Sequence, residues 1–151
     1  MRLRTLVLAL AVSLTPAAAQ TTEELKALMQ KITVAWCTLD PAKAACFCMT
    51  EGKHVFYDVA PPICTGWKEY ADGTGKMFAT LSAMKITLAS DVQTHVRGSV
   101  AWGTATCKAE LTLKSGRAET LDTRWTVIWE KRGNDWLVTH EHFSAPAPPD
   151  K

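Results

Sequence analysis

The sequence lacks an apolar segment long enough to cross a membrane. It also lacks an excess of positive or negative charge once its first few residues are left out. The longest apolar run, Leu6 to Leu14, is shorter than the roughly 20 residues that a spanning helix needs. The formal charge of +2 comes from Arg2 and Arg4, because removing these two lowers the basic count from 17 to 15, equal to the 15 acidic residues. A nucleic-acid-binding surface or a polybasic membrane-binding segment is therefore not indicated.

The first 19 residues have the organisation of a secretory signal peptide. Arg2 and Arg4 precede the apolar run, and Ala17, Ala18 and Ala19 supply the small residues of a cleavage site. We expect cleavage after Ala19, which makes the mature protein periplasmic or secreted. No cysteine follows the site, so lipid attachment there is not expected, and neither is contact with the membrane after cleavage.

The cysteines form neither a zinc-binding nor a redox motif, because no Cys-x-x-Cys pair occurs among them. In an exported protein one or two disulfides are expected, and an odd count leaves at least one thiol unpaired within the chain. The pairing stays open, although two cysteines only two residues apart on one helix point in different directions and do not suit a bridge. The five are Cys37, Cys46, Cys48, Cys64 and Cys107.

Three helices are expected in the first half of the chain. Residues 21–39 repeat apolar side chains at helical spacing, and Thr21 begins a capping-box pattern. Asp40 before Pro41 is typical of a helix cap followed by a proline in the first turn, so a second, short helix should start there. Residues 67–81 again place apolar side chains on one helical side, although two internal glycines weaken this third helix.

Strands dominate the rest of the chain, where the apolar period changes to two. The expected strands, separated by glycine-containing turns, are residues 54–59, 85–96, 99–113, 119–131 and 136–144. Helices followed by long consecutive strands predict an α+β fold in which helices cover one face of a curved antiparallel β-sheet. There are no internal repeats, so we expect one domain over residues 20–146, followed by a proline-rich tail at 147–151.

The last hairpin predicts which side chains face the interior. Residues 133–134, Gly-Asn, suit a two-residue turn. Counting outward from the turn pairs Trp129 with Val138, Val127 with His140, and Trp125 with His142. Because this face is aromatic, we expect it to turn toward the helices and to carry His140 and His142 inward. Arg124 and Glu141 would then pair diagonally on the opposite face.

Four stretches carry a resemblance to a known family: "AWCTLD", "VFYDVAPPICTGWKEY", "GSVAWGTAT" and "RWTVIWEKRGNDWLVTHEHFSAP". They resemble the nuclear transport factor 2-like superfamily, in particular its SnoaL-like branch, which is related to ketosteroid isomerases and polyketide cyclases. The resemblance covers nearly the whole mature chain and implies a cone-shaped sheet on three N-terminal helices, a pocket between sheet and helices, and usually a homodimer. The last stretch also resembles the association domain of calmodulin-dependent kinases, so the fold also serves assembly.

The resemblance places Asp58 where steroid isomerases keep their general base. A carboxylate beside an apolar cavity has a raised pKa, which suits proton abstraction next to a carbonyl group. Such chemistry also needs donors for the developing oxyanion. The positions of the two donors of the isomerases are occupied here by Ile32 and Val127, so steroid isomerisation itself is not indicated. His140 and His142 are the candidates to replace them, and we take Asp58 and both histidines as candidate catalytic residues.

The expected function is binding of a small apolar or aromatic molecule, with proton-transfer chemistry of an isomerase, dehydratase or cyclase and without a cofactor. The residues expected to contact the ligand are Trp36, Tyr57, Trp67, Trp125, Val127, Trp129 and Ser144. Two alternatives stay open. The chain is a non-catalytic assembly domain whose own side chains fill the pocket, or His140 and His142 chelate a metal, which requires a third ligand from Asp58 or Cys64. Structural explanations also exist for each candidate, because tryptophans pack in cores and inward histidines are usually satisfied by backbone groups.

Overall fold

The computed structural model describes residues 17–59 and 63–147. Most of the expected signal peptide, residues 1–19, and most of the proline-rich tail, 147–151, lie outside the described residues. Within the described part of the chain, none of the helices combines the length and the apolar character needed to cross a membrane.

Three helices occupy the first half of the chain: α1 (Ala17–Trp36), α2 (Pro41–Ala45) and α3 (Trp67–Phe78). Asp40 caps α2 as predicted, because its Oδ1 accepts a hydrogen bond from the N–H of Ala42 at 3.0 Å. The predicted cap at Thr21 is wrong, since α1 begins earlier and Thr21 lies inside it. The two glycines of α3 are accommodated within an unbroken helix.

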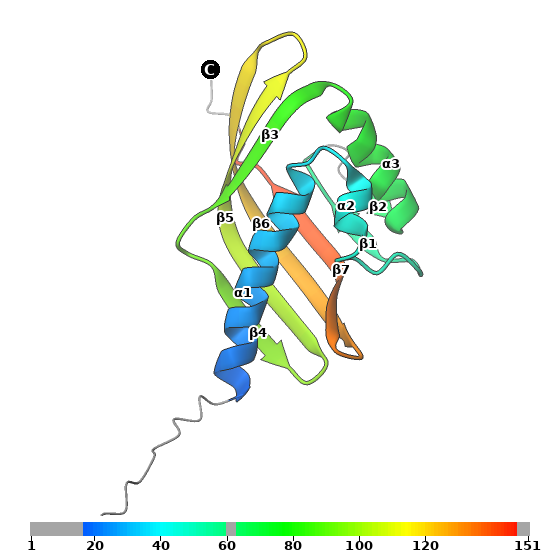
Figure 1. The fold of residues 1–151 in the computed structure, drawn as a ribbon, viewed down its shortest axis with the longest axis vertical. Helices are drawn as coiled ribbons and strands as arrows, with labels where there is room; N and C mark the ends of the chain where they lie inside the picture. The colour runs from blue at the N-terminus through cyan, green and yellow to red at the C-terminus, as the bar shows by residue number, and fades with distance from the viewer. Residues whose placement is uncertain (1–16, 60–62, 148–151) are drawn as a thin grey trace, which may run out of the picture.

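Seven strands form one sheet: β1 (Val55–Tyr57), β2 (Cys64–Thr65), β3 (Leu81–Leu88), β4 (Gln93–Arg97), β5 (Val100–Leu113), β6 (Ala118–Arg132) and β7 (Asp135–Ser144). Their order is β2-β1-β7-β6-β5-β3, and β4 pairs with the other half of the same edge of β5 (Figure 1). The sheet is mixed rather than fully antiparallel, because β1 runs parallel to β7. The predicted α+β class is otherwise confirmed.

The single strand expected over residues 85–96 is two strands, β3 and β4. The chain leaves the sheet between them, where the N–H of Ala89 donates to the carbonyl oxygen of Thr106. The carboxylate of Asp91 then accepts hydrogen bonds from the N–H and the hydroxyl of Thr106, at 3.1 and 2.9 Å. The Asp91 side chain thus takes the place of backbone hydrogen bonds between strands, and the strand is interrupted there. The alternation of apolar residues does not predict such an interruption.

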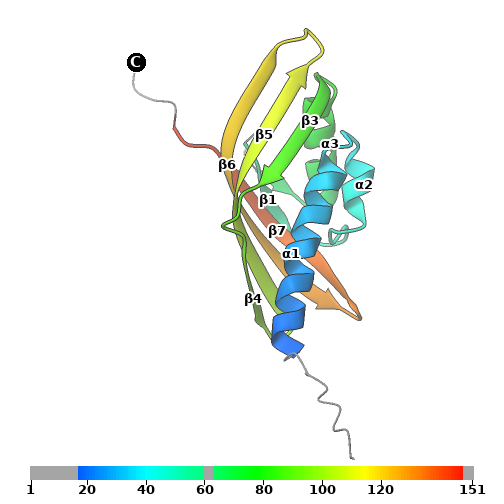
Figure 2. The same cartoon turned by 60° about the vertical axis from the view of Figure 1, so that its left-hand side comes forward.

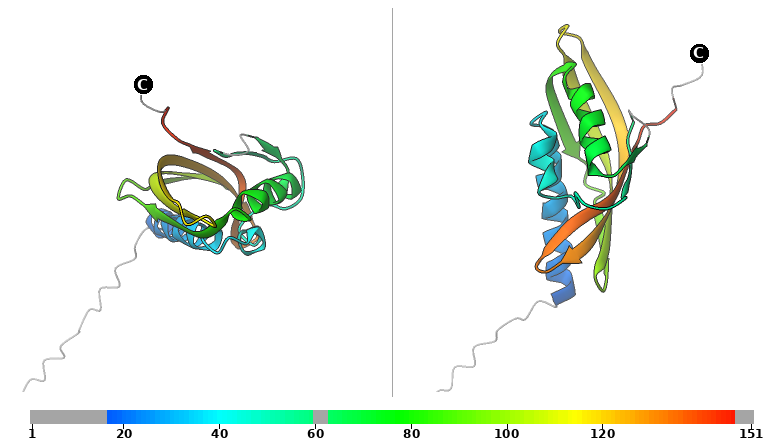
Figure 3. Two further views of the ribbon diagram at one scale, coloured as in Figure 1. Left: turned by 90° about the horizontal axis from the view of Figure 1, so that it is seen from above. Right: turned by 90° about the vertical axis from the view of Figure 1, so that its right-hand side faces the viewer.

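The sheet bends strongly, and the helices lie on its concave side (Figure 2). α1 runs along the inside of the curve, while α2 and α3 cover the region next to β1 and β2 (Figure 3). This is the cone shape that the family resemblance implied, and the space between the helices and the sheet is where the resemblance implied a pocket.

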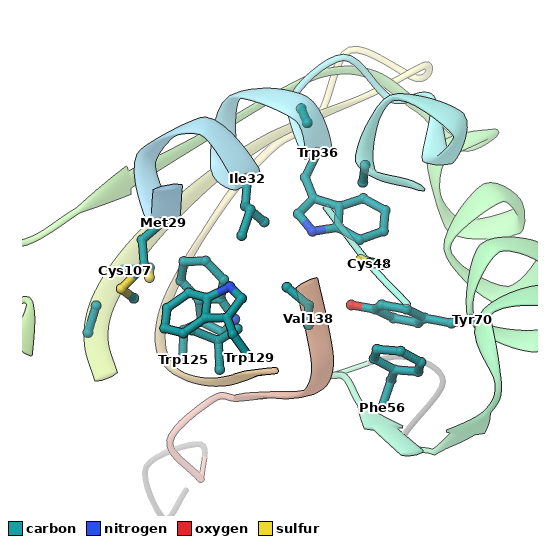
Figure 4. Close-up of a cluster of buried hydrophobic side chains, with 14 of the residues drawn as sticks. Met29, Ile32, Trp36, Cys48, Phe56, Tyr70, Cys107, Trp125, Trp129 and Val138 are labelled. Carbon is teal, nitrogen blue, oxygen red and sulfur yellow. The ribbon is translucent and has the colours of Figure 1, made fainter. Parts of the chain in front are cut away.

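The core lies between α1 and the middle strands (Figure 4). Trp125, Val127 and Trp129 of β6 are buried against Met29 and other apolar side chains of α1. Gly103 on β5 permits this close approach, since a Cβ atom there would lie 2.8 Å from the sulfur of Met29 and 2.9 Å from the ring of Trp129. Each fully buried large side chain contributes about 1.5–3 kcal/mol, so this layer supplies much of the stability.

A β-bulge in the last hairpin corrects the predicted register. Trp129 does pair with Val138, but Ile128 then pairs with His140, so Thr139 is the extra residue of β7. Beyond the bulge Trp125 pairs with Phe143 instead of His142. Every later side chain of β7 therefore faces the side opposite to the prediction.

The bulge exchanges the residues that face the interior. Glu141 is completely buried, whereas His142 is exposed and His140 is only partly buried. The predicted inward orientation of both histidines is therefore wrong. The predicted outer pair of Arg124 with Glu141 is wrong for the same reason.

All five cysteines carry free thiols, so the expected disulfides are not present in the structure. Cys48, Cys64 and Cys107 are buried, and the sulfur of Cys37 accepts a hydrogen bond from the N–H of Ile86 at 3.1 Å. Cys46 alone among the five is exposed. Four of the five thus serve packing in the described fold.

Candidate functional site

A cavity of about 80 Å³ lies between helices α1 and α3 and strands β3, β5, β6 and β7. Most of its wall is apolar, with Met77 and Phe78 from α3, Met84 and Ile86 from β3, and Phe143 from β7. Such a mostly apolar cavity with a few polar groups is the usual form of a small-molecule site. Its polar lining side chains are therefore the candidates to orient a ligand or to act on it.

Asp58 provides the carboxylate of the cavity among the described lining residues. It follows the last residue of β1, and Phe56, two residues earlier, is fully buried, so the strand directs Asp58 toward the same interior side. Burial raises the pKa of Asp58 to about 6, although the N–H of Val59 donates to its Oδ1 at 2.6 Å and acts in the opposite direction. A carboxyl group with this pKa is mostly ionised at pH 7 and is a better proton acceptor than an exposed aspartate.

A second carboxyl group lies close to Asp58 but is fully enclosed. Glu141 of β7 accepts a hydrogen bond at Oε1 from the hydroxyl of Tyr70, at 2.8 Å, and another at Oε2 from the indole N–H of Trp125, at 3.1 Å. The pKa of Glu141 is raised to about 7: burial is the largest cause and the negative charge of Asp58 adds to it, while the two hydrogen bonds act in the opposite direction. Close to neutral pH, Glu141 is thus divided between its protonated and ionised forms.

Tyr70 lines the same cavity as Asp58, and its hydroxyl bonds to Glu141. Its ring stacks on Phe56 with centroids 4.6 Å apart and meets the edge of Trp36 at 5.4 Å. Figure 4 shows Tyr70 on α3 with its hydroxyl directed at β7. Burial beside Glu141 holds the pKa of Tyr70 well above its usual value, so it acts as a neutral hydrogen-bond donor.

The two candidate histidines lie on the outer face of the sheet and not in this cavity. The carbonyl oxygen of Val55 accepts a hydrogen bond from Nδ1 of His140 at 2.7 Å. The ring of Tyr57 meets the rings of His140 and His142 edge-on, each with a centroid distance of 5.5 Å. These contacts give both histidines structural partners.

A shallow hollow on the outer face nevertheless joins several predicted residues. Tyr57, Asp58, His142 and Ser144 line it. Asp58 also lines the inner cavity, so this residue lies at the boundary between the two spaces. The structure therefore brings Asp58 near His142, but across the sheet edge and not inside one apolar site.

The predicted tryptophans have different positions. Trp36 lines the cavity. Trp67 does not line it, but its ring packs against that of Trp36, with centroids 6.2 Å apart. Trp125 donates a hydrogen bond to Glu141. Val127 and Trp129 are buried in the core and do not line the cavity. Of the seven predicted ligand contacts, Trp36 alone belongs to the described cavity lining.

Tyr70 and Glu141 were missed by the sequence analysis. The sequence did contain a sign that the predicted register was wrong. A hairpin without a bulge places the apolar Phe143 on the outer face, together with the charged Arg124 and Glu141. Moving the register by one residue puts Phe143 opposite Trp125, where their rings do stack with centroids 5.2 Å apart. The same move turns Glu141 inward.

Metal binding by the two outer histidines lacks a third ligand in the described part of the chain. No group of three or more His, Cys, Asp or Glu side chains comes close enough there to hold a metal ion. The nearest partner of His140 is a backbone carbonyl group instead.

Comparison with known families agrees with the geometry. A family model described as the SnoaL-like domain matches residues 25–148. The chain belongs to the SnoaL-like domain family. No curated protein matches the sequence.

Solved structures share the fold at low sequence identity. A nuclear transport factor 2-like superfamily protein from Salmonella enterica is 20% identical, with a TM-score of 0.71 over 88% of this chain and 93% of that one. A protein from Streptomyces avermitilis, named as a candidate dehydratase of this family, is 16% identical, with a TM-score of 0.76 over 86% and 99%. A candidate calcium/calmodulin-dependent protein kinase II association domain from Xanthomonas campestris is 22% identical, with a TM-score of 0.70 over 82% and 86%. At these identities the likeness extends to the fold alone.

Proposed function

We propose that this SnoaL-like domain binds a small, mostly apolar molecule in the cavity beside Asp58 and transfers a proton on it, as isomerases and dehydratases do. The observation that carries the proposal is the position of one carboxylate, Asp58, in an otherwise largely apolar lining. Its raised pKa, about 6, matches the requirement for a general base that works near neutral pH. The dehydratase named among the similar structures adds support for this class of chemistry.

The proton transfer requires no cofactor. The Asp58 carboxylate removes a proton from a carbon atom next to a carbonyl group, and the electron pair of that C–H bond forms a C=C bond while the carbonyl π electrons move to oxygen. The protonated Asp58 then returns the proton to the ligand, either to the same carbon or to a conjugated one. Return to a conjugated carbon isomerises a double bond, and all atoms and electrons are conserved.

Glu141 assists by limiting the negative charge in the site. If both carboxyl groups were ionised, each would repel the other in a buried environment. Because the pKa of Glu141 is raised to about 7, it takes up a proton more readily than Asp58, whose pKa is about 6. Asp58 is thereby left as the ionised group that faces the ligand.

Exchange of carbon-bound hydrogen tests this proposal. Cyclohexanone is incubated in D₂O with the wild type, Asp58→Asn or the matched control Asp135→Asn, in which the altered carboxyl group is exposed at the hairpin turn. NMR should show faster loss of the α-hydrogens with the wild type and Asp135→Asn than in buffer. Asp58→Asn should lose about 100-fold or more of the catalysed rate, the usual contribution of a general base. An equal rate in Asp58→Asn and wild type would contradict the proposal, as would no rate above that of buffer.

We further propose that the chain is exported and is cleaved after Ala19. The proposal rests on the sequence pattern of the first 19 residues. N-terminal sequencing of the protein secreted or released from the periplasm should give Gln20 as the first residue. Retention of Met1 in that fraction would exclude cleavage.

Assembly is the second candidate function, and we propose a homodimer through the outer face of the sheet. The supporting observation is the ring of Tyr57, 39% exposed, between His140 and the exposed His142. Light scattering at micromolar concentration should show a dimer that Tyr57→Glu dissociates. Val34→Glu, at an exposed position of α1, is the control that should remain dimeric. A monomeric wild type would contradict the proposal.

A further inference from the structure

The strand side of the cavity is open, whereas its helix side is closed. The large apolar side chains that line it from the strands are only half-buried, although they lie on the concave face of the sheet. The helices leave this part of the sheet uncovered, because the hairpin between β5 and β6 extends beyond them (Figure 2). The side chains concerned form an apolar strip: Met84 and Ile86 of β3, Leu111 of β5 and Leu121 of β6.

The strip runs across the strands toward the side of the cavity where Asp58 lies. Met84 is paired with Leu111, and Ala109 lies between Ile86 and Leu121, so these side chains share one face. Asp58 follows β1, and the strands from there are β7, β6, β5 and β3 in order. At about 4.8 Å between neighbouring strands, the lining from β1 to β3 covers about 19 Å. It is therefore much longer than a single six-membered ring.

The size of the cavity and its polar groups both favour a ligand that extends along the strip. The cavity of about 80 Å³ is small beside the roughly 300–1,000 Å³ of ordinary small-molecule sites, so a ligand of ordinary size reaches beyond it. The hydroxyl of Thr74 donates to the carbonyl oxygen of Tyr70 at 2.8 Å, and that of Thr123 to the carbonyl oxygen of Cys107 at 3.4 Å. Since Tyr70 donates to Glu141, the hydroxyl groups of the lining are committed, and contact along the strip is apolar.

We propose that the ligand carries an alkyl chain that lies across the apolar strip while its reacting end lies beside Asp58. This inference rests on the proposed function, because it assigns the chain to the ligand of the same cavity. The substrate class is then a carbonyl compound with an aliphatic extension rather than a single compact ring.

Two features favour an alkyl chain as the occupant of the strip. Met77 of α3 and Met84 of β3 both line the cavity, and their unbranched, flexible side chains adapt to a chain of variable conformation. A second copy of the protein leaves the strip uncovered, because the proposed homodimer uses the opposite face of the sheet. Half-exposed apolar side chains gathered at one place are typical of a binding surface.

A series of probes that share one reacting end tests the inference on the unmodified protein. The series is cyclohexanone, 4-propylcyclohexanone and 4-pentylcyclohexanone, and calorimetry or NMR titration gives the Kd of each. Each methylene that contacts the strip should lower the Kd by up to about fourfold, so the pentyl compound should bind most tightly.

Methyl resonances locate the chain. In ¹H–¹³C NMR spectra of the wild type, the pentyl compound should shift the methyl groups of Met84, Leu111 and Leu121 more than cyclohexanone does. The methyl groups of Val100, which is 38% exposed near the other end of β5, are the internal control and should respond to neither probe.

Variants add an independent measure, the ratio of the Kd of cyclohexanone to that of 4-pentylcyclohexanone. Leu121→Asn places a polar group in the strip and should lower this ratio at least threefold. Val100→Asn makes the same kind of change outside the cavity and should keep the wild-type ratio. Because the ratio compares two probes on one protein, a general loss of affinity in a variant does not imitate the effect.

The outcomes separate this inference from the proposed function. Equal Kd values along the series overturn the inference, even if hydrogen exchange still depends on Asp58. Tighter binding of the pentyl compound with shifts at the strip supports it, and if hydrogen exchange is absent the proposed proton transfer alone is contradicted. Strip resonances that follow protein concentration and not the probes would show that a second copy covers the strip, which overturns the inference. It is overturned as well if no probe binds up to its solubility limit.

Discussion

The hydroxyl of Tyr70 lies 2.8 Å from Oε1 of Glu141, a contact between side chains 71 residues apart in the sequence. It joins α3 to β7 inside the cone and supplies one of the two hydrogen bonds that Glu141 accepts. The pair is fully buried beside Asp58, so the site contains two carboxyl groups whose charges influence each other.

Stability should depend on pH through Glu141. An acid whose pKa is raised on folding binds more protons in the folded state, so stability falls as pH rises from its ordinary value of 4.5 to about 7. The shift corresponds to about 3 kcal/mol across this window. Urea unfolding between pH 4.5 and 8 should show that Glu141→Gln loses the part of this dependence that Glu141 causes, above all between about pH 6 and 7, whereas the part that Asp58 causes up to about pH 6 remains.

The matched control for this prediction is Glu24→Gln, which changes an exposed carboxyl group on α1. It should retain the wild-type dependence on pH. An unchanged pH profile in Glu141→Gln would show that Glu141 has a similar pKa in the folded and unfolded chains.

Thr139 is the extra residue of the bulge, so its deletion should be tolerated. Without it, the pairs Trp129 with Val138 and Ile128 with His140 become neighbours in a regular ladder, and Glu141 stays inward. Deletion of Thr126, in a regular part of β6, should instead shift the alternation of that strand by one residue. The apolar side chains on one side of the deletion would then face outward, and the chain should not fold. Near-UV circular dichroism of the tryptophans measures both. Loss of the native signal on deletion of Thr139 would contradict the assigned register.

Gly103 should not tolerate a larger side chain. The Cβ atom of Gly103→Ala would lie 2.8 Å from the sulfur of Met29 and 2.9 Å from the ring of Trp129, so the overpacking should cost about 1–3 kcal/mol. Gly75→Ala is the control, because its nearest neighbour, Pro41, lies at an ordinary 3.8 Å, and alanine favours the helix by up to about 1 kcal/mol. Thermal unfolding should give opposite shifts, and a stable Gly103→Ala would mean that α1 lies farther from the sheet.

The thiols should react in the order of their exposure. Cys46 is exposed and should react first with a thiol reagent, and Cys37 more slowly. Cys48, Cys64 and Cys107 should react only after unfolding, since they are buried and burial raises their pKa values, that of Cys107 to about 11. Alkylation in denaturant without reductant should modify all five. A lower count would reveal a disulfide in the protein as isolated.

Local patterns were predictable from the sequence. Asp40 before Pro41 located the start of α2, and the Gly-Asn turn at residues 133–134 located the last hairpin. The alternation of Trp125, Val127 and Trp129 identified the buried face of β6. Each of these depends on a few neighbouring residues, which is why periodicity and capping rules detect them.

The candidate site was predicted less well because long-range contacts determine it. Asp58 was placed at a cavity by resemblance to the family, and the structure has it there. The bulge at Thr139 has no local marker, so strict alternation turned the histidines inward and Glu141 outward. The inward position of Glu141 on β7 depends on donors from Tyr70 on α3 and Trp125 on β6, both of them on other elements of the fold. No window of neighbouring residues contains this information.

An NMR titration of the carboxyl carbon of Asp58 tests the account most directly. The proposed function requires a carboxyl group that burial has made basic, and the structure gives a pKa of about 6. The resonance should therefore titrate near pH 6 in the wild type and in Asp135→Asn, and it should be absent in Asp58→Asn. Titration near pH 4, as for an exposed aspartate, would contradict the claim that Asp58 is the general base of an apolar cavity.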